Sequence, residues 1–346
     1  MSMKILHIIF SFNIGGAETM LVDIINEQVK FQTVGLLVVN NLYNPDLLKK
    51  IDTKVSLFFV NRKKGSLNPF KLISVNRIVN RYNPQIIHFH DHNAIGLLLC
   101  RRYYTTALTV HDVGFSPGYF KKYDKLFAIS QAVQKDILDR SGIKSDLVYN
   151  GIYIDRIKVK TAETNNIFRI VQVSRLDHLK KGQHILLKSI KLLVNTCEIT
   201  NFSLDFIGGG DSESYLKGLV KEYKLEKQVN FLGEKSREEI YNNLCNYDLL
   251  VQPSIYEGFG LTVTEAMAAK VPVLVSANDG PMEIIANGKY GFWFNNGDAE
   301  HCCEQIRNIL SSRKKQDKML DDAYSYVAEN FNIVNTASQY IDNYSN

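Results

Sequence analysis

Two glutamates stand eight residues apart in the stretch YEGFGLTVTEAMAAKVPVLV. Gly258 and Gly260 lie between Glu257 and Glu265 and allow main-chain N–H groups to approach a ligand closely. The helix expected to begin near Leu261 adds the positive end of its dipole, so this stretch would attract a phosphate. Because carboxylates repel phosphate, the two glutamates should bind neutral hydroxyl groups on either side of it.

A nucleotide sugar has the groups that this pattern would bind. A carboxylate accepts two hydrogen bonds from a vicinal diol, as the acidic residue that binds the ribose does in dinucleotide folds. One glutamate would bind a ribose and the other a hexose, with a diphosphate between them. The alternative is a helix-capping acid beside an ordinary surface acid, which needs no ligand.

A second stretch, SRLDHLKKGQHILLKSI, places Arg175 and Lys181 in a loop between an apolar strand and an amphipathic helix. Sugar transfer leaves negative charge on a departing diphosphate, and fixed cations stabilise that charge without a metal. A basic loop alone is usually solvated, but beside the two glutamates it predicts a diphosphate site. The sequence has no Asp-x-Asp pair of the kind that holds the ion in metal-dependent sugar transferases, so neither a metal nor another cofactor is expected.

Short apolar runs alternate with longer helical patterns, which is typical of parallel sheets covered by helices on both faces. The first series of runs covers 4–10, 33–39, 85–90, 107–112, 125–130 and 146–151. After a polar stretch interpreted as a linker, 155–166, the series restarts at 168–174, 202–208, 228–233, 247–253 and 271–277. The sequence therefore predicts an α/β protein of two doubly wound, Rossmann-like domains that face each other across a cleft.

Composition agrees with a globular protein of two domains, since the chain has 346 residues, 45% of them hydrophobic and 22% charged. Five cysteines without a C-x-x-C pair suit reduced thiols in the cytosol. The run KILHIIF is interpreted as a first buried strand rather than a signal core, and no apolar run approaches the roughly 18 residues of a membrane span. We therefore expect a cytoplasmic protein.

Positive charge gathers in the first half, where residues 1–155 hold 19 Lys and Arg against 12 Asp and Glu. Basic residues alternate there with aromatic ones in two groups: Arg62, Lys63, Lys64 and Lys71 around Phe70, and Lys121 and Lys122 beside Tyr119, Phe120 and Tyr123. This mixture favours docking on an anionic membrane surface, such as the inner face of the cell membrane, although solvated loops explain it equally well. No RNP-type or helix-turn-helix pattern supports nucleic acid as a partner.

The chain resembles the retaining GT-B glycosyltransferases of glycosyltransferase family 4, also called glycosyl transferases group 1. The similar segments follow one another in order along nearly the whole chain: GGAET, HFHDH, TVHD, AISQAVQKDIL, YNGI, SRLDHLKKG, FIGGGD, VNFLGEKSREEIY, YDLLVQPSIYEGFGLTVTEAMAAKVPVLVS, GPMEII and NGKYGFWFNNGD. The resemblance implies an N-terminal acceptor-side domain at 1–155, a nucleotide-sugar-binding domain at 156–328, and a last helix, about 329–346, that packs back on the first domain.

The resemblance also implies roles for the residues of the two stretches. Glu257 would contact the donor hexose and Glu265 the ribose. The diphosphate would be held by the loop from Gly258 through Phe259 and Gly260 to Leu261, together with Arg175 and Lys181. The loop RLDHLKKG has one residue more than the family pattern, so either Lys180 or Lys181 could be the contact; Lys181 is favoured because it directly precedes Gly182.

In the first half, the resemblance places Gly15 and Gly16 in a loop that approaches the donor phosphates. It places His111 near the donor sugar, where it would bond a sugar hydroxyl or stabilise developing charge. His88, His90 and His92 would share one face if the strand runs that far, and three such histidines could bind zinc. Because this chemistry gives a metal no task, we instead expect His90 or Asp91 to line the acceptor pocket, with His88 buried.

The sequence therefore predicts a retaining, metal-independent hexosyltransferase. It would move a sugar from a nucleoside diphosphate donor, with a UDP-sugar favoured, to a glycan or lipid-linked acceptor in surface polysaccharide synthesis. Two alternatives remain open: a GDP-mannose-dependent mannosyltransferase, and a nucleotide-sugar epimerase with the same architecture, which would act without any acceptor.

Overall fold

The computed structural model describes residues 2–100, 103–161, 167–312 and 317–345. The chain forms two compact units. The N-terminal unit comprises Met1–Gly151 and Asn332–Asn346, and the C-terminal unit comprises Ile152–Phe331. The chain therefore passes from one unit to the other at 151/152 and again at 331/332, slightly displaced from the boundaries predicted at 155/156 and 328/329.

The first part of the predicted linker is not a linker. The backbone N–H of Lys158 donates to the carbonyl of Tyr241 at 3.0 Å, and Lys160 Nζ forms an ion pair with Asp248 at 2.6 Å. The segment 155–161 is therefore part of the C-terminal unit, because a backbone N–H and a lysine side chain of this polar stretch have partners there. The rest of the predicted linker, 162–166, lies outside the described residues.

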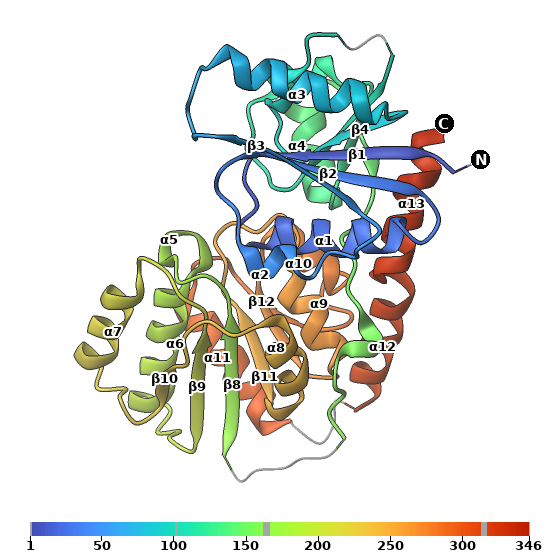
Figure 1. Cartoon of the computed structure of the whole chain (residues 1–346). Helices are drawn as coiled ribbons and strands as arrows, with labels where there is room; N and C mark the ends of the chain where they lie inside the picture. Colours follow the sequence, from blue (N-terminus) through green and yellow to red (C-terminus); the bar gives the residue numbers. More distant parts are fainter. Residues whose placement is uncertain (1, 101–102, 162–166, 313–316, 346) are drawn as a thin grey trace. The chain divides into compact units, whose positions relative to one another are not determined.

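A sheet of seven parallel strands, counted within the described ranges, forms the N-terminal unit, in the order β3-β2-β1-β4-β5-β6-β7. The strands are β1 (Lys4–Ile9), β2 (Thr33–Asn40), β3 (Ser56–Arg62), β4 (Ile86–Phe89), β5 (Thr105–Val110), β6 (Lys125–Ala128) and β7 (Asp146–Leu147). The helices are α1 (Gly16–Gln28), α2 (Pro45–Leu48), α3 (Pro69–Tyr82), α4 (Gln131–Ser141) and α13 (Ile333–Ser345), with 3₁₀ helices η1 (Ala94–Leu97) and η2 (Pro117–Lys122). Figure 1 shows α1 and α3 on opposite sides of β1 and β2.

The last helix, α13, completes the N-terminal unit by packing against α1. Its Thr336 hydroxyl donates to the carbonyl of Tyr149 at 2.9 Å, and its Tyr340 and Tyr344 are buried. A Cβ at Gly151 would come within 2.6 Å of the Ile333 backbone and 2.5 Å of Thr336 Oγ1. The absence of a side chain at Gly151 therefore lets the start of α13 lie directly on the end of the first segment.

The C-terminal unit contains, among its described residues, a sheet of six parallel strands in the order β10-β9-β8-β11-β12-β13. The strands are β8 (Phe168–Val173), β9 (Phe202–Ile207), β10 (Val229–Phe231), β11 (Leu249–Gln252), β12 (Val273–Ser276) and β13 (Phe292–Phe294). The helices are α5 (His178–Lys181), α6 (Gln183–Asn195), α7 (Glu213–Glu222), α8 (Arg237–Asn243), α9 (Leu261–Ala268), α10 (Asp279–Ile284), α11 (Ala299–Ser311) and α12 (Asp317–Asn330), with η3 (Ile154–Arg156) and η4 (Leu244–Asn246).

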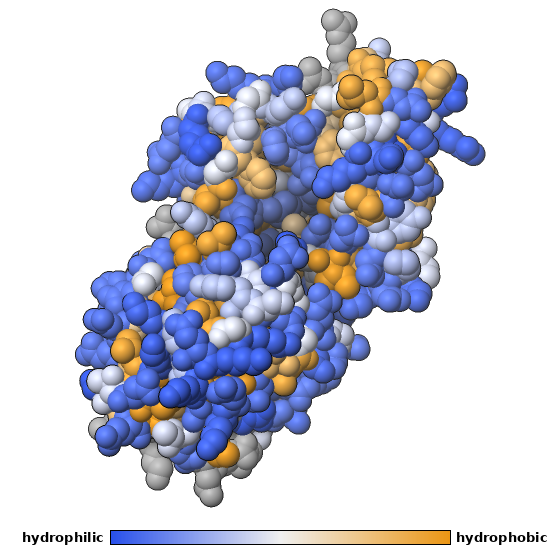
Figure 2. Space-filling view, turned by 90° about the vertical axis from the view of Figure 1, so that its left-hand side faces the viewer, coloured by the Kyte–Doolittle hydropathy of each residue, from blue (hydrophilic) through white to orange (hydrophobic). Residues whose placement is uncertain are grey.

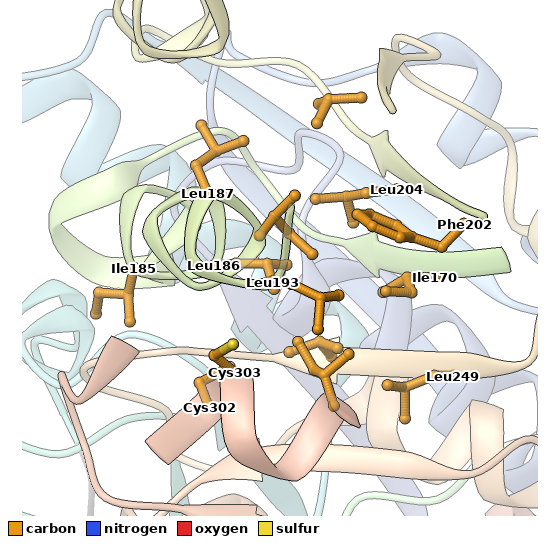
Figure 3. Packing of buried hydrophobic residues seen from close by; sticks show 14 of the residues in the cluster. Ile170, Ile185, Leu186, Leu187, Leu193, Phe202, Leu204, Leu249, Cys302 and Cys303 are labelled. Atoms are coloured by element: carbon orange, nitrogen blue, oxygen red, sulfur yellow. The ribbon is translucent and has the colours of Figure 1, made fainter. Parts of the chain in front are cut away.

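The core of the C-terminal unit lies between its sheet and the helices α6 and α11. Figure 3 shows Leu186 and Leu193 of α6 near Ile170 of β8, with Cys302 and Cys303 of α11 beside them. Each fully buried leucine stabilises the fold by roughly 1.5–3 kcal/mol relative to an exposed one. Burial raises the pKa of Cys302 to about 12, so this thiol serves as an apolar core group.

Each sheet reverses its strand order once. In the N-terminal unit, β1 pairs with both β2 and β4, and in the C-terminal unit β8 pairs with both β9 and β11. Loops leave the carboxyl ends of these neighbouring strands in opposite directions, which opens the usual ligand position of a doubly wound sheet. The two parallel-sheet units confirm the predicted α/β fold class.

The surface drawn in Figure 2 is largely hydrophilic, with hydrophobic residues in scattered groups. No helix in the part of the chain that the structure describes is both long and apolar enough to cross a membrane.

Gly151→Ala should destabilise the protein by about 1–3 kcal/mol, because the added methyl group would overlap the Ile333 backbone. Urea unfolding followed by circular dichroism would measure this change. Gly96→Ala is a matched control, since a Cβ at Gly96 meets no described atom within 4 Å. Equal stability of the two variants would contradict the close packing of α13.

Candidate active site

The two stretches singled out in the sequence leave adjacent strands of the C-terminal unit. The segment with Arg175 and Lys181, which ends in the short helix α5, follows β8, and the loop with Glu257 follows β11. These two strands pair directly, with Leu249 opposite Ile170, at the point where the strand order reverses. The topology therefore brings residues that are distant in sequence to one edge of the sheet.

Gly182 determines how closely the two loops approach. It adopts a φ of 66°, in the left-handed region that favours glycine, and a Cβ there would collide with the carbonyl of Pro253. The backbone N–H of Ile255 also donates to the carbonyl of Lys180 at 2.9 Å. Lys181 is thereby held directly beside the loop that follows β11.

Lys181 Nζ forms an ion pair with Glu257 Oε2 at 2.6 Å. The same oxygen accepts hydrogen bonds from Gln252 Nε2 at 3.1 Å and Ser254 Oγ at 3.2 Å. The Lys181 and Glu257 side chains are only 19% and 15% exposed, so the pair is shielded from screening by solvent. The structure thus joins Lys181 to the glutamate motif and adds Gln252 and Ser254, which the sequence analysis did not identify.

Arg175 lies on the same loop, with an exposed side chain. Its backbone carbonyl accepts a hydrogen bond from Gln183 Nε2 at 2.8 Å. The glycine-rich turn FIGGGD packs beneath this loop, because a Cβ at Gly208 or Gly210 would collide with the carbonyl of Ser174 or Leu176, respectively. The turn therefore positions the backbone around Arg175.

Glu265 is buried in the second turn of α9, and its Oε1 lies 3.7 Å from Nε of Arg237. Arg237 begins α8, directly after the capping box formed by Ser236 and Glu239, and was also missed by the sequence analysis. The segment SREE, which contains Arg237, predicts the start of a helix. Nothing in that segment indicates that Arg237 contacts Glu265.

The loop between the glutamates ends at the start of α9. Gly260 precedes this helix with a φ of 117°, Leu261 is its first residue, and the first N–H groups of a helix have no partner within it. The Phe259 side chain is buried and contacts Phe331 edge to face. A Cβ at Gly280 would collide with the Glu257 carbonyl, which shows how tightly α10 supports the loop.

In the N-terminal unit, Gly15 precedes α1 and Gly16 is its first residue. A Cβ at Gly15 would collide with the carboxylate of Glu18, which therefore lies over the start of the helix. A carboxylate stabilises this positive end of the helix dipole. A phosphate that bound there would have to displace it.

Four histidines from three strands lie together on one face of the N-terminal sheet. His7 of β1 stands in register with His88 of β4, and His90 and His111 follow the ends of β4 and β5. Their rings pack at centroid distances of 5.1 Å (His7–His88), 4.6 Å (His88–His90) and 5.4 Å (His90–His111). Burial lowers the pKa of His7 and of His111 to about 4, so both are neutral at neutral pH.

The three histidines that lie together are not the three that the sequence analysis considered for zinc. The strand ends at Phe89, so His92 turns away and packs against Phe115, and His7 takes its place. Ligand atoms of His7, His88 and His90 lie within 4.8 Å of one another. However, both ring nitrogens of each have hydrogen-bond partners in the protein, which fits a hydrogen-bond network better than a metal site.

The two residues expected in the acceptor pocket have different surroundings. His90 is buried, and both of its ring nitrogens are bonded to other histidines. Asp91 is half-buried and accepts a hydrogen bond from the backbone N–H of Phe10 at 2.7 Å. Burial raises the pKa of Asp91. Asp91 therefore links β4 to the loop after β1.

A surface pocket of about 750 Å³ lies at the other end of the strands. It is lined by residues that start β5 and by the segment before it, including Tyr103, Thr105 and Thr106. Ligands of parallel sheets bind at the carboxyl ends, where the histidines lie, so we do not assign this pocket to catalysis.

Comparison with known families identifies the chain. The model of the family "Glycosyl transferases group 1" matches 154–326, and that of "Glycosyltransferase Family 4" matches 14–156. The chain belongs to the glycosyl transferases group 1 and is a glycosyltransferase, as the resemblance of its motifs implied.

Similar proteins agree with this class. An uncharacterized glycosyltransferase of Methanocaldococcus jannaschii, MJ1607, is 26% identical over 77% of this chain and 76% of its own length. The amylovoran biosynthesis glycosyltransferase AmsK of Erwinia amylovora is 28% identical over 53% of this chain and 47% of its own length. The crystal structure of Anabaena HepE in complex with UDP-glucose has a TM-score of 0.84 at 22% identity and covers 99% of both chains, which shows the shared GT-B fold.

Acidification should destabilise the protein between pH 6.5 and 4. The unfolded histidines bind protons below about pH 6.5, whereas His7 and His111 in the folded protein bind them only near pH 4. Stability is therefore complete above the unfolded pKa and is lost as the pH falls, by about 1.4 kcal/mol per unit of pKa difference for each group. Asp91, with its raised pKa, acts in the opposite direction.

Urea unfolding at a series of pH values would measure this loss. His111→Asn should flatten the pH dependence, and His301→Gln, in the C-terminal unit, is the matched control. An unfolding free energy that stays constant from pH 6.5 to 5 would contradict the buried neutral histidines.

Proposed function

We propose that this glycosyltransferase is a retaining enzyme that moves a hexosyl group from a nucleoside diphosphate sugar, by preference a UDP-sugar, to a glycan or lipid-linked acceptor. The observation that carries the proposal is the Lys181–Glu257 pair, with Arg175 on the same loop, at the strand reversal of the C-terminal sheet. A cation for a diphosphate and a carboxylate for hydroxyl groups lie there within 2.6 Å of each other.

Donor binding would divide this ion pair between two parts of one ligand. The phosphate oxygens replace Glu257 as the partner of Lys181, and hexose hydroxyl groups replace Lys181 as the donors to Glu257. Gln252 and Ser254 continue to donate to the carboxylate, so it stays in place during the exchange. Neither charge is left buried and unpaired before or after binding, which avoids the large penalty of an uncompensated charge.

Catalysis would then consist of positioning and stabilisation of the leaving group. The bond between the anomeric carbon and the phosphate oxygen breaks, and the electron pair stays on the diphosphate beside Arg175, Lys181 and the start of α9. The acceptor hydroxyl attacks the same face of the sugar, forms the new glycosidic bond, and passes its proton to the departing phosphate oxygen. Glu265 would bind the ribose, with Arg237 supporting its carboxylate.

The preference for a UDP-sugar and for polysaccharide synthesis rests on similar proteins. HepE has been crystallised with UDP-glucose, and the name of AmsK assigns it to amylovoran biosynthesis.

A panel of UDP-, GDP- and ADP-sugars would test the proposal. A UDP-sugar should raise the unfolding free energy, by roughly 2.7 kcal/mol at a concentration of a hundred times its Kd, and should be slowly hydrolysed. Both effects should persist in EDTA, since protein cations take the place of a metal. A response to GDP-mannose alone would identify a mannosyltransferase, conversion of the sugar without hydrolysis would identify an epimerase, and loss of turnover in EDTA with rescue by Mn²⁺ would contradict the metal-independent mechanism.

Arg175→Ala and Lys181→Ala should each cost about 2–4 kcal/mol of transition-state stabilisation, because each removes a donor to the charge on the leaving group. The measurement is kcat/KM for transfer or donor hydrolysis. Lys180→Ala is the matched control, since it removes the neighbouring lysine and leaves the Lys181–Glu257 pair in place. If Lys180→Ala showed the larger loss, the assignment of the two lysines would be reversed.

We also propose that the loop between β3 and α3, together with the first turn of α3, docks the enzyme on anionic membranes. Leu67 and Phe70 are 96% and 74% exposed there, next to exposed Lys63 and Lys64. Of the other basic residues expected in this group, Arg62 donates to Asn40 and Lys71 to the carbonyl of Val60. The second expected group is weaker, because Phe120 and Tyr123 are buried.

Binding to vesicles that contain anionic lipid should decrease as salt concentration rises. The double variant Lys63→Gln/Lys64→Gln and the single variant Phe70→Ser should both weaken it. Phe31→Ser, at a position that is 71% exposed elsewhere in the same unit, should not. Binding that is independent of salt, or equally weakened by Phe31→Ser, would count against this surface.

A further inference from the structure

Three of the four clustered histidines form a continuous chain of hydrogen bonds that begins at Gln28 of α1. Gln28 Oε1 lies 2.8 Å from His7 Nε2, His7 Nδ1 lies 3.0 Å from His90 Nε2, and His90 Nδ1 lies 3.1 Å from His111 Nε2. Among the described residues, His111 Nδ1 has no hydrogen-bond partner. The chain therefore runs from the Gln28 amide to an unpaired nitrogen of His111, the histidine that the family resemblance places near the donor sugar.

The Gln28 carbonyl sets the direction of every proton in this chain. It can only accept, so His7 carries its proton on Nε2 and leaves Nδ1 as an acceptor. His90 must then donate from Nε2 to His7, and His111 must donate from Nε2 to His90. A neutral imidazole has one proton, so Nδ1 of His111 is left with a lone pair.

A separate set of hydrogen bonds keeps His88 out of the chain. His88 Nδ1 lies 2.5 Å from the Tyr344 hydroxyl, and His88 Nε2 lies 2.7 Å from the Thr109 hydroxyl. Thr109 donates in turn to the Tyr340 hydroxyl at 3.1 Å. Tyr344 and Thr109 thus satisfy the two nitrogens of His88, so that it competes for neither His7 nor His90.

We propose that Gln28, His7 and His90 are positioning residues that fix His111 in the tautomer whose Nδ1 accepts a hydrogen bond from a hydroxyl group of the transferred sugar. This inference rests on the proposed function for the presence of a sugar at His111. It decides between the two roles open to His111: an acceptor from a hydroxyl group, rather than a cation or donor that stabilises developing negative charge.

The energetics of burial support this role. A buried polar atom without a partner costs free energy, and a ligand hydroxyl that pairs with it removes that cost. Protonation of His111 would place a charge among the other buried histidines, and burial lowers the pKa of all four rings. A neutral His111 ring whose Nδ1 lone pair accepts from the sugar avoids both the unpaired buried atom and the buried charge. Such a ring needs no reorientation when the sugar binds.

The tautomers can be measured without any substrate. Long-range ¹H–¹⁵N NMR spectra of protein labelled with ¹⁵N-histidine distinguish a protonated ring nitrogen from a bare one. We expect His7, His90 and His111 to be neutral and protonated on Nε2. A proton on Nδ1 of His111, an imidazolium at His111, or displacement of these signals by added zinc would overturn the proposal.

Substitution of Gln28 tests the link to catalysis. Gln28→Met removes the acceptor at similar length, so His111 should populate both tautomers and kcat should fall about tenfold with the donor KM nearly unchanged. Gln28→Glu keeps an acceptor in place and should restore the Nε2 tautomers and most of kcat. His301→Gln is the control for NMR assignment and for the effect of removing a histidine elsewhere.

The two readouts separate the possible failures. If the NMR tautomers are as expected but no sugar donor binds, the proposed function is wrong and the histidine chain stands as a structural feature. If sugar transfer is confirmed and Gln28→Met changes the tautomers while kcat stays at the wild-type value, the positioning role is wrong. If Gln28→Met does not fold, the wild-type spectra and Gln28→Glu still decide the direction of the protons.

Discussion

The ion pair of Lys181 and Glu257 joins two loops that leave neighbouring strands of one sheet, and the candidate donor site is organised around it. It forms because Gly182 has no side chain to separate its loop from Pro253. Gln252 and Ser254 complete the hydrogen bonds of the carboxylate. A largely buried pair of this kind adds little net stability, but each partner would be costly to leave alone. It keeps a cation and a carboxylate ready for a ligand that offers an anion and hydroxyl groups side by side.

The N-terminal unit also holds polar side chains in place at its strand ends, but these groups are neutral. Its strand reversal brings His7 and His88 into register, and helices α1 and α13 supply Gln28 and Tyr344 as hydrogen-bond partners of these rings. Charges are absent from this cluster because burial lowers the pKa of every ring. One unit therefore presents charge at its strand ends, and the other presents oriented neutral imidazoles. Both arrangements are preset by protein contacts, which suits catalysis by positioning.

Most strands could be predicted because a strand buried on both faces is a continuous apolar run. The strands that were not predicted, β3 and β13, lie at sheet edges, where one side has no neighbouring strand. Several residues of β3 are exposed, and β13 spans only Phe292–Phe294, so neither shows the pattern of a buried strand. The polar stretch at 155–161 was interpreted as a linker because it is rich in charge and poor in apolar residues. It is nevertheless packed, because Lys160 pairs with Asp248, which is distant in the sequence.

The sequence by itself determined the class of the protein, since the spacing of Glu257 and Glu265, the glycines between them and the order of apolar runs are local features that a reader of the chain can see. Only the tertiary structure decided which groups meet. His7 stands 83 residues from its partner His90, and Arg237 comes to Glu265 from another helix. Partners of this kind are set by strand register and helix packing, which depend on the whole core and leave no periodic signal in the residues concerned.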